Sequence, residues 1–178
     1  MNSIGQLGNT VILFTSDQGQ VMGEHRINSE GLGWQYGESI KVPLIIRGPN
    51  IPANQNRNHI VANVDLAPTI LELAQATPTR VQDGRSFMSI IANPLASWRT
   101  AVLLHSEFRS NRNYRGVQTL QYVYVEQAAS TEKEIYDLTN DPYQLQSQHM
   151  NPAYQTIMNS LKNILDILKT CTGSACWQ

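Results

Sequence analysis

Hydrophobic and polar positions in the first half of the chain predict strands and one helix. The apolar, β-branched run Thr10–Thr15 predicts a buried strand that ends in the polar turn Ser16–Gly19. A second apolar run, Leu44–Arg47, predicts another strand. Asp65 is typical of a helix N-cap, and the helix is expected to run through Ala74. One face of that helix suits packing on a sheet, with apolar positions at Leu66, Ile70, Leu71, Leu73 and Ala74. This half therefore has an α/β pattern.

From about residue 96 the pattern changes to short β-type runs separated by polar turns. This spacing predicts an antiparallel meander over Ala101–His105, Tyr114–Thr119, Gln121–Val125 and Glu134–Tyr136. A closing helix is predicted over 152–169, with Asn151 as its N-cap and Pro152 at its first position. Its apolar residues fall on one stripe: Tyr154, Ile157, Met158, Leu161, Ile164, Leu165 and Leu168. We expect an α/β part over 1–95 and an antiparallel sheet with a C-terminal helix over 96–178.

Composition narrows the range of partners. The chain has 178 residues, of which 41% are hydrophobic and 15% charged, and its formal net charge is −1. This balance gives no electrostatic case for binding nucleic acid or an anionic membrane surface. No run approaches the ~20 apolar residues of a membrane helix, and no signal peptide is visible. Because only nine residues precede the first strand, the chain is expected to begin inside a larger fold, truncated at its N-terminus.

Two cysteines, Cys171 and Cys176, lie near the end in C-T-G-S-A-C-W. The four residues between them, including Gly173, allow a small disulfide loop, which is favoured over a free pair and indicates an oxidising compartment. A zinc site is disfavoured, since no histidine lies nearby and two thiols do not make four ligands. Three arginines at 109, 112 and 115 are compatible with an anionic ligand, although a solvated loop is the favoured interpretation.

The end of the first strand carries the candidate chemistry. Asp17 offers a carboxylate and Gln18 an amide oxygen, and both are hard donors suited to a Ca²⁺- or Mg²⁺-type ion. Ligands of open α/β sheets gather at the carboxyl ends of strands. The alternative is a solvated turn carboxylate. Taken alone, this position does not decide between a metal ligand and an ordinary turn.

Several segments in register resemble the C-terminal part of the type I sulfatases. T-S-D-Q-G and then G-E-H-R are followed by Tyr36–Pro49, Val64–Leu71, Asp83–Ser86 and Ile135–Pro142, in the order that the family has them. The ending Leu168–Cys176 is most similar to the N-acetylglucosamine-6-sulfatase-like branch. The resemblance covers nearly the whole chain, and although each motif is weak alone, chance does not explain six in register.

The resemblance implies part of an alkaline-phosphatase-like sandwich and hydrolysis of sulfate monoesters. The substrate would be a sulfated small molecule or glycan such as N-acetylglucosamine 6-sulfate. Family members use a formylglycine nucleophile with Ca²⁺ or another divalent cation. The resemblance assigns Asp17 and Gln18 to the metal, although Asn is commoner at the second place. It also assigns His25 to the sulfate, where it would donate a hydrogen bond or a proton; a surface-loop histidine is the alternative.

The chain departs from the family pattern in two ways. No Cys or Ser stands in a C/S-x-P/A-x-R motif, so the formylglycine and the first pair of metal-binding aspartates are expected only in the missing N-terminal part. Leu32 stands where the family usually has a lysine, and neither Arg26 nor Lys41 occupies that position. The chain alone is therefore expected to be inactive, since covalent catalysis needs its nucleophile.

Three functional hypotheses remain. The first is the C-terminal part of a sulfatase whose N-terminal half is lost or separately encoded. The second is a non-catalytic sulfatase-like binding module, and the third a fragment of another alkaline-phosphatase-superfamily hydrolase. For the parent family, a secreted, periplasmic or lysosome-like location is expected.

Overall fold

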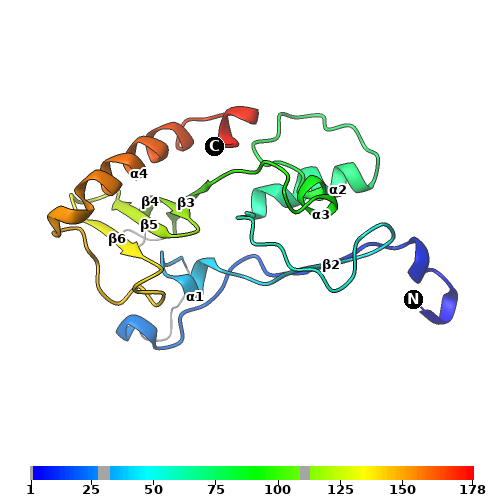
Figure 1. Ribbon diagram of the computed structural model, residues 1–178, viewed down its shortest axis with the longest axis horizontal. Helices are drawn as coiled ribbons and strands as arrows, with labels where there is room; N and C mark the ends of the chain where they lie inside the picture. Colours follow the sequence, from blue (N-terminus) through cyan, green and yellow to red (C-terminus); the bar gives the residue numbers. More distant parts are fainter. Residues whose placement is uncertain (1, 28–32, 109–112) are drawn as a thin grey trace.

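The computed structural model describes residues 2–27, 33–108 and 113–178. Figure 1 shows two groups of elements. One contains the strands β3–β6 with helix α4 lying across them, and the other contains α2 and α3 above the short antiparallel β1–β2 pair. The extended segment leading into β3 connects the two groups. The short helix α1 (Gly37–Ile40) lies close to the sheet of the first group.

The second half of the chain forms the predicted meander. Strands β3 (Ala101–Glu107), β4 (Asn113–Thr119), β5 (Tyr122–Gln127) and β6 (Lys133–Asp137) pair antiparallel in the order β3-β4-β5-β6. The alternation of apolar and polar residues places Val117 and Tyr124 opposite each other on the face toward α4. The prediction of an antiparallel meander is confirmed.

Helix α4 (Gln155–Leu168) closes one face of this sheet, as predicted. Asn151 caps the 3-10 turn Pro152–Tyr154 that precedes it, because its side-chain oxygen accepts the N–H of Ala153 at 3.1 Å. The apolar stripe forms the larger core with residues of the sheet, and its buried members are Ala101, Val117, Tyr124, Ile135, Met158, Leu161, Leu165 and Leu168. A helix with one apolar face and a sheet with one apolar face thus bury each other.

The first strand is shorter and less buried than its sequence predicts. Strand β1 (Ile12–Thr15) pairs antiparallel only with β2 (Leu44–Arg47). Phe14 and Ile45 stand opposite each other and are 60% and 61% exposed. The expectation of a buried strand is wrong for this chain, because no element of the described residues covers that face. Its opposite face contributes Leu13 and Ile46 to a small apolar cluster.

That small cluster centres on a helix that the sequence analysis did not predict. Helix α3 (Met88–Ala92) and the preceding Phe87 bury their apolar side chains against Leu66 and the inner face of the β1–β2 pair. Helix α2 (Leu66–Leu73) lies where it is predicted, and Ala74 ends it. Its expected apolar face is only partly used, since Ile70 and Ala74 are exposed.

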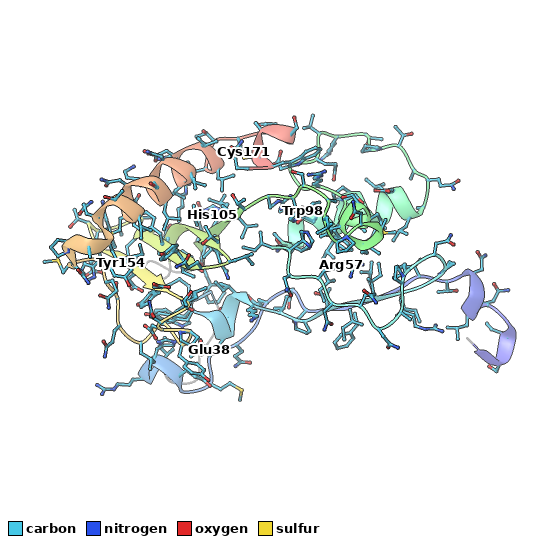
Figure 2. All side chains as sticks on the ribbon, in the orientation of Figure 1. Glu38, Arg57, Trp98, His105, Tyr154 and Cys171 are labelled. Carbon is cyan, nitrogen blue, oxygen red and sulfur yellow. A yellow bond between two sulfur atoms is a disulfide. The ribbon has the colours of Figure 1, made fainter. Side chains whose placement is uncertain are left out.

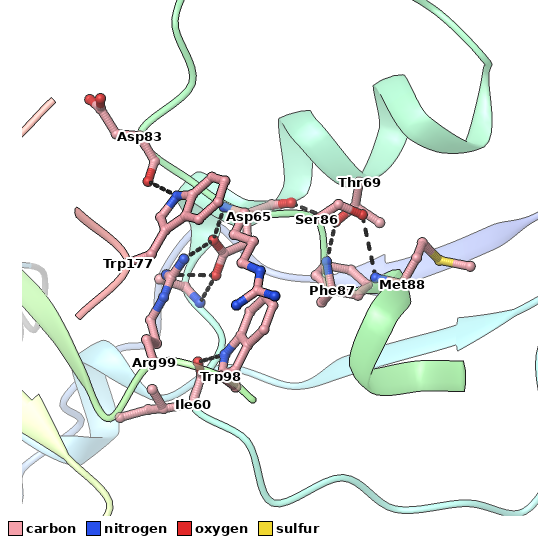
Figure 3. A network of polar contacts seen from close by, with 12 residues as sticks. Ile60, Asp65, Thr69, Asp83, Ser86, Phe87, Met88, Trp98, Arg99 and Trp177 are labelled. Carbon is pink, nitrogen blue, oxygen red and sulfur yellow. Dashed lines mark hydrogen bonds and ion pairs between the residues drawn. The ribbon is translucent and has the colours of Figure 1, made fainter. Parts of the chain in front are cut away.

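Asp65 stands at the N-cap position of α2, as predicted, but its side chain has another role. Its carboxylate makes no capping bond to α2; it accepts the N–H groups of Ala62 at 2.9 Å and Arg85 at 2.7 Å. Both terminal nitrogens of Arg99 donate to it, at 2.9 and 2.7 Å, and the pair is buried on both sides (Figure 3). Arg99 stands at the entrance to β3, so this ion pair joins the two groups of elements. A division of domains after residue 95 stays a prediction.

The chain end is tied back to the first half. Cys171 and Cys176 form a disulfide, which confirms the favoured interpretation of the two cysteines. The loop that this bond closes donates the N–H of Gly173 to the Asp83 carboxylate at 2.7 Å. The indole N–H of Trp177 donates to the Asp83 carbonyl at 3.0 Å (Figure 3). The disulfide loop therefore holds the end of α4 against the segment before α3.

Candidate functional site

The turn after β1 presents the two predicted metal ligands to solvent. Asp17 and Gln18 are both exposed. One oxygen of Asp17, Oδ1, accepts the N–H of Gln18 at 2.9 Å, and the hydroxyl of Ser16 donates to the carbonyl of Gln18 at 2.8 Å. These local bonds fix the turn, as is usual for Asp and Ser in tight turns. The second oxygen of Asp17 has no bonding partner among the described residues.

Gly19 locks this turn against helix α1. Its N–H donates to the carbonyl of Ser39 at 2.8 Å. A Cβ at position 19 would lie 2.0 Å from the backbone oxygen of Glu38, far inside van der Waals contact. Only glycine allows the two backbones to approach so closely. The position of the Asp17–Gln18 pair is thus set by its contact with α1.

His25 is attached to the same helix. It lies in the turn Glu24–Arg26 in the left-handed conformation, with φ of 54°. The imidazole stacks on the ring of Tyr36, with centroids 3.7 Å apart and planes inclined by 10°. Its Nε2 lies 3.4 Å from a carboxylate oxygen of Glu38 on α1 (Figure 2), an ion-pair distance without hydrogen-bond geometry. The side chain is only 9% exposed, which argues against the surface-loop alternative, and the assignment of His25 to the sulfate stays a prediction.

The turn that carries His25 is braced by its own backbone. The Glu24 carboxylate accepts the N–H of Met22 at 2.6 Å, and this bond lowers the pKa of Glu24. Non-glycine residues in the left-handed region cost of order 1–3 kcal/mol and are frequent at functional sites. Here two consecutive residues, His25 and Arg26, adopt it, with φ of 54° and 58°. The ring stack on Tyr36 is therefore held by a defined local conformation.

Helix α1 contacts both segments that carry the predicted site residues. The Asp17–Gln18 turn reaches it through Gly19, and His25 reaches it through Glu38. The sequence analysis quoted Tyr36 and Glu38 within a family segment without assigning them a role. Burial raises the pKa of Tyr36 to about 12, and the nearby Glu134 carboxylate adds to the shift. This tyrosine consequently stays a neutral stacking surface at physiological pH.

The donor set fits part of the shell of a hard cation. Asp17 and Gln18 supply oxygens of the kind that Ca²⁺ prefers, but Ca²⁺ takes 6–8 of them. Within the described residues no group of three or more His, Cys, Asp or Glu side chains is placed to hold a metal.

Other residues singled out in the sequence contribute little here. Leu32, Arg109 and Arg112 lie outside the described residues. Arg115 is paired on the surface, 3.8 Å from a Glu107 oxygen. Lys41 is exposed and ends α1, where its backbone N–H donates to the Gly37 carbonyl.

Comparison with known proteins identifies the family. Residues 23–170 match the family model described as N-sulphoglucosamine sulphohydrolase, C-terminal. An N-acetylglucosamine-6-sulfatase of Capra hircus is 30% identical over 97% of this chain, which spans 37% of that protein. A Drosophila melanogaster protein named as an extracellular sulfatase homologue is 37% identical over 51% of this chain and 8% of its own length. The chain thus spans little more than a third of the first of these relatives.

Solved structures give the same result. A protein crystallised with its substrate, D-glucosamine-2-N,6-O-disulfate, superposes with a TM-score of 0.84 and 30% identity, over 93% of this chain and 35% of that one. The alkaline-phosphatase-like α/β fold class expected from the sequence is confirmed. No helix in the described ranges is long and apolar enough to cross a membrane. The chain therefore belongs to the type I sulfatase family and corresponds to the C-terminal region of its members.

Proposed function

We propose that this chain supplies the C-terminal side of a site that hydrolyses sulfate monoesters. The observation that carries the proposal is the packing of two segments against one helical turn, α1: the turn after Asp17 and Gln18, through Gly19, and the turn that carries His25, through Glu38. A sulfated small molecule or glycan is the substrate class, with N-acetylglucosamine 6-sulfate the specific candidate. The names of the goat relative and of the substrate in the superposed structure support that choice.

Asp17 and Gln18 are assigned as two ligands of Ca²⁺ or another divalent cation. Both side chains are exposed, and the turn fixes the Asp17 carboxylate through the N–H of Gln18, so Asp17 needs little reorganisation to bind. When bound, such a cation offsets the negative charge of the sulfate oxygens. The remaining ligands and the formylglycine nucleophile are assigned to a polypeptide region that relatives carry before the region matched here.

His25 is assigned to the sulfate oxygens. Its Nε2 faces Glu38, which leaves Nδ1 on the opposite side of the ring, without a hydrogen-bond partner among the described residues. A neutral imidazole has one donor and one acceptor nitrogen, and a protonated one donates from both. The Glu38 carboxylate beside Nε2 favours a proton on that nitrogen, so Nδ1 donates a hydrogen bond or a proton to the substrate from the doubly protonated ring.

The exposed face of the β1–β2 pair is the surface we assign to the N-terminal sulfatase region, whether encoded in the same or a separate gene. Phe14 and Ile45 form an exposed apolar cross-strand pair on it. Isolated two-stranded sheets are marginal, and open apolar edges favour association. Since the goat relative is almost three times as long as the matched region, its additional sequence is sufficient to supply the covering elements.

A secreted, periplasmic or lysosome-like location is proposed for the assembled protein. The Cys171–Cys176 disulfide supports an oxidising compartment. The relative named as extracellular supports the same location.

The proposal is tested by complementation. DNA upstream of the codon for Met1 is read for a frame with a C/S-x-P/A-x-R motif and an Asp-Asp pair, and that polypeptide is produced with this chain. We expect glucosamine 6-sulfate hydrolysis from the pair, none from this chain alone with Ca²⁺, and loss of hydrolysis with Asp17→Asn. Glu72→Gln, a neutralised carboxylate on the exposed side of α2, is the matched control.

Two results would contradict the proposal. Hydrolysis by the assembled pair that survives Asp17→Asn removes Asp17 from the site. Sulfate binding without hydrolysis, in a pair that contains the formylglycine motif, favours a non-catalytic sulfatase-like module instead.

A further inference from the structure

Helix α1 is held in place by a glutamine from the segment that follows strand β6. The N–H of Gly37 donates to the side-chain oxygen of Gln144 at 2.7 Å, across 107 positions of sequence. The amide nitrogen of Gln144 lies 3.5 Å from the carbonyl of Gln35 and donates to it. Gln144 is 3% exposed. One buried side chain thus binds the backbone on both sides of Tyr36.

Gln144 is held in an uncommon conformation that the surrounding turn enforces. Its φ is 55°, in the left-handed region where glycine or asparagine is usual. Asp141 closes the turn around it: its carbonyl accepts the N–H of Gln144, and its carboxylate accepts those of Leu145 and Gln146 at 3.0 and 2.8 Å. A strained residue fixed in this way directs its side chain reproducibly.

A second link runs from strand β6 to the histidine. Glu134 accepts the amide N–H of Gln35 at 3.0 Å and the hydroxyl of Tyr136 at 2.7 Å. The Tyr136 ring meets Tyr36 edge-on, with centroids 6.4 Å apart. Tyr36 in turn carries the stacked imidazole of His25. The Glu134 carboxylate therefore holds Gln35, which precedes Tyr36 in the chain, and Tyr136, whose ring contacts that of Tyr36.

We propose that Gln144 and Glu134 are positioning residues, which set the orientation of His25 through Tyr36 and helix α1. This inference rests on the proposed function, which assigns His25 to the sulfate. Neither residue belongs to an apolar cluster of the described residues, and hydrogen-bonded polar side chains in the interior rigidify the groups that they bind. The C-terminal sheet thus acts on the site although none of its residues is assigned to the substrate.

The test reads the position of the His25 ring in the full chain by NMR. Stacking on Tyr36 moves the ring protons of His25 upfield, and His25→Gln identifies them among the four histidines. Gln144→Gly removes the amide but relieves the left-handed strain, and Gln146→Gly is its matched control, since Gln146 is exposed. Glu134→Ala is compared with Glu132→Ala, which changes an exposed carboxylate before β6.

We expect Gln144→Gly and Glu134→Ala each to lose more than half of the upfield displacement, and the two controls to retain it. The melting temperature of Gln144→Gly is expected to match that of Gln146→Gly, which a purely stabilising role would not allow. Unchanged His25 shifts in folded Gln144→Gly and Glu134→Ala would overturn the inference. If Gln144→Gly does not fold, Gln144→Asn takes its place, because asparagine tolerates φ near 55° but is too short to reach Gly37.

Failure of the proposed function would be seen differently. In that case the ring protons of His25 respond to Gln144 and Glu134 as expected, but not to inorganic sulfate added to the complemented protein. The two results are therefore separable in the same spectra.

Discussion

Replacing Asp65 by alanine tests whether its buried carboxylate joins the two parts of the fold. The side chain is 0% exposed and accepts from the backbone of Ala62 and Arg85 and from both terminal nitrogens of Arg99. Its removal leaves the Arg99 guanidinium buried without a counter-charge, which costs about 3–5 kcal/mol. The two backbone N–H groups lose their acceptor as well, at about 1 kcal/mol each. We expect a loss of about 6 kcal/mol in the free energy of unfolding, a large part of a typical stability of about 5–15 kcal/mol.

A double variant separates the cost of the unpaired Arg99 charge from the cost of the two lost backbone hydrogen bonds. In Asp65→Leu/Arg99→Met the unpaired cation is gone, while the N–H groups of Ala62 and Arg85 stay unsatisfied. We therefore expect this double variant to lose only about 2 kcal/mol. Glu72→Ala, on the exposed side of α2, is the control, expected to change stability by less than about 0.5 kcal/mol.

The assay is urea unfolding, followed by tryptophan fluorescence because Trp98 and Trp177 lie in the same network (Figure 3). Circular dichroism follows the helices in parallel. A loss below about 1 kcal/mol for Asp65→Ala would refute the assignment, since a buried charge left without its partner costs several times more. A double variant no more stable than Asp65→Ala would refute the separation of terms.

Three further predictions concern other parts of the chain. Replacing Cys171 and Cys176 by serine is expected to cost about 2 kcal/mol, the chain-entropy value for so short a loop; urea midpoints with and without reductant measure it, and a reductant effect on the serine variant would contradict it. Because the pKa of Tyr36 is raised to about 12 while an unfolded tyrosine ionises near 10, stability falls as pH rises from about 10 to 12. Tyr36→Phe is expected to show a shallower fall in urea titrations across that range, and equal slopes would count against it. A polypeptide of residues 96–178 alone is expected to melt cooperatively, because the larger core lies within it; a featureless thermal trace by circular dichroism would show otherwise.

Much of the C-terminal part is predictable from local pattern. The apolar residues from Tyr154 to Leu168 repeat with the helical period, and short β-type runs separated by polar turns mark the strands of the sheet. For α4, this pattern indicates which face is buried. The apolar run of β1 gives no such answer. Phe14 has the sequence character of a buried residue, yet its side chain is 60% exposed among the described residues. Sequence pattern indicates what a strand is suited to contact, but not whether that contact is present.

The candidate site shows the same limit more sharply. Asp17, Gln18 and His25 are recognisable because they stand in short segments with a family pattern. Gln144 stands in no such segment, and the role of Glu38 arises, like that of Gln144, from a contact that the sequence pattern does not show. A lone glutamine with φ of 55° leaves no signal in one sequence, where glycine or asparagine would have suggested a turn.

The site belongs to neither half of the chain alone. Helix α1 has four residues, a single turn, and an isolated turn is unstable because helix nucleation is costly. Its position is fixed by Gly19 on the side of the metal-ligand turn and by Gln144 on the side of the sheet. Without either contact, helix α1 would no longer hold the Asp17–Gln18 turn and His25 in fixed positions relative to each other. In the proposed function, the C-terminal sheet supplies the fixed surface against which the candidate site residues of the first half are aligned.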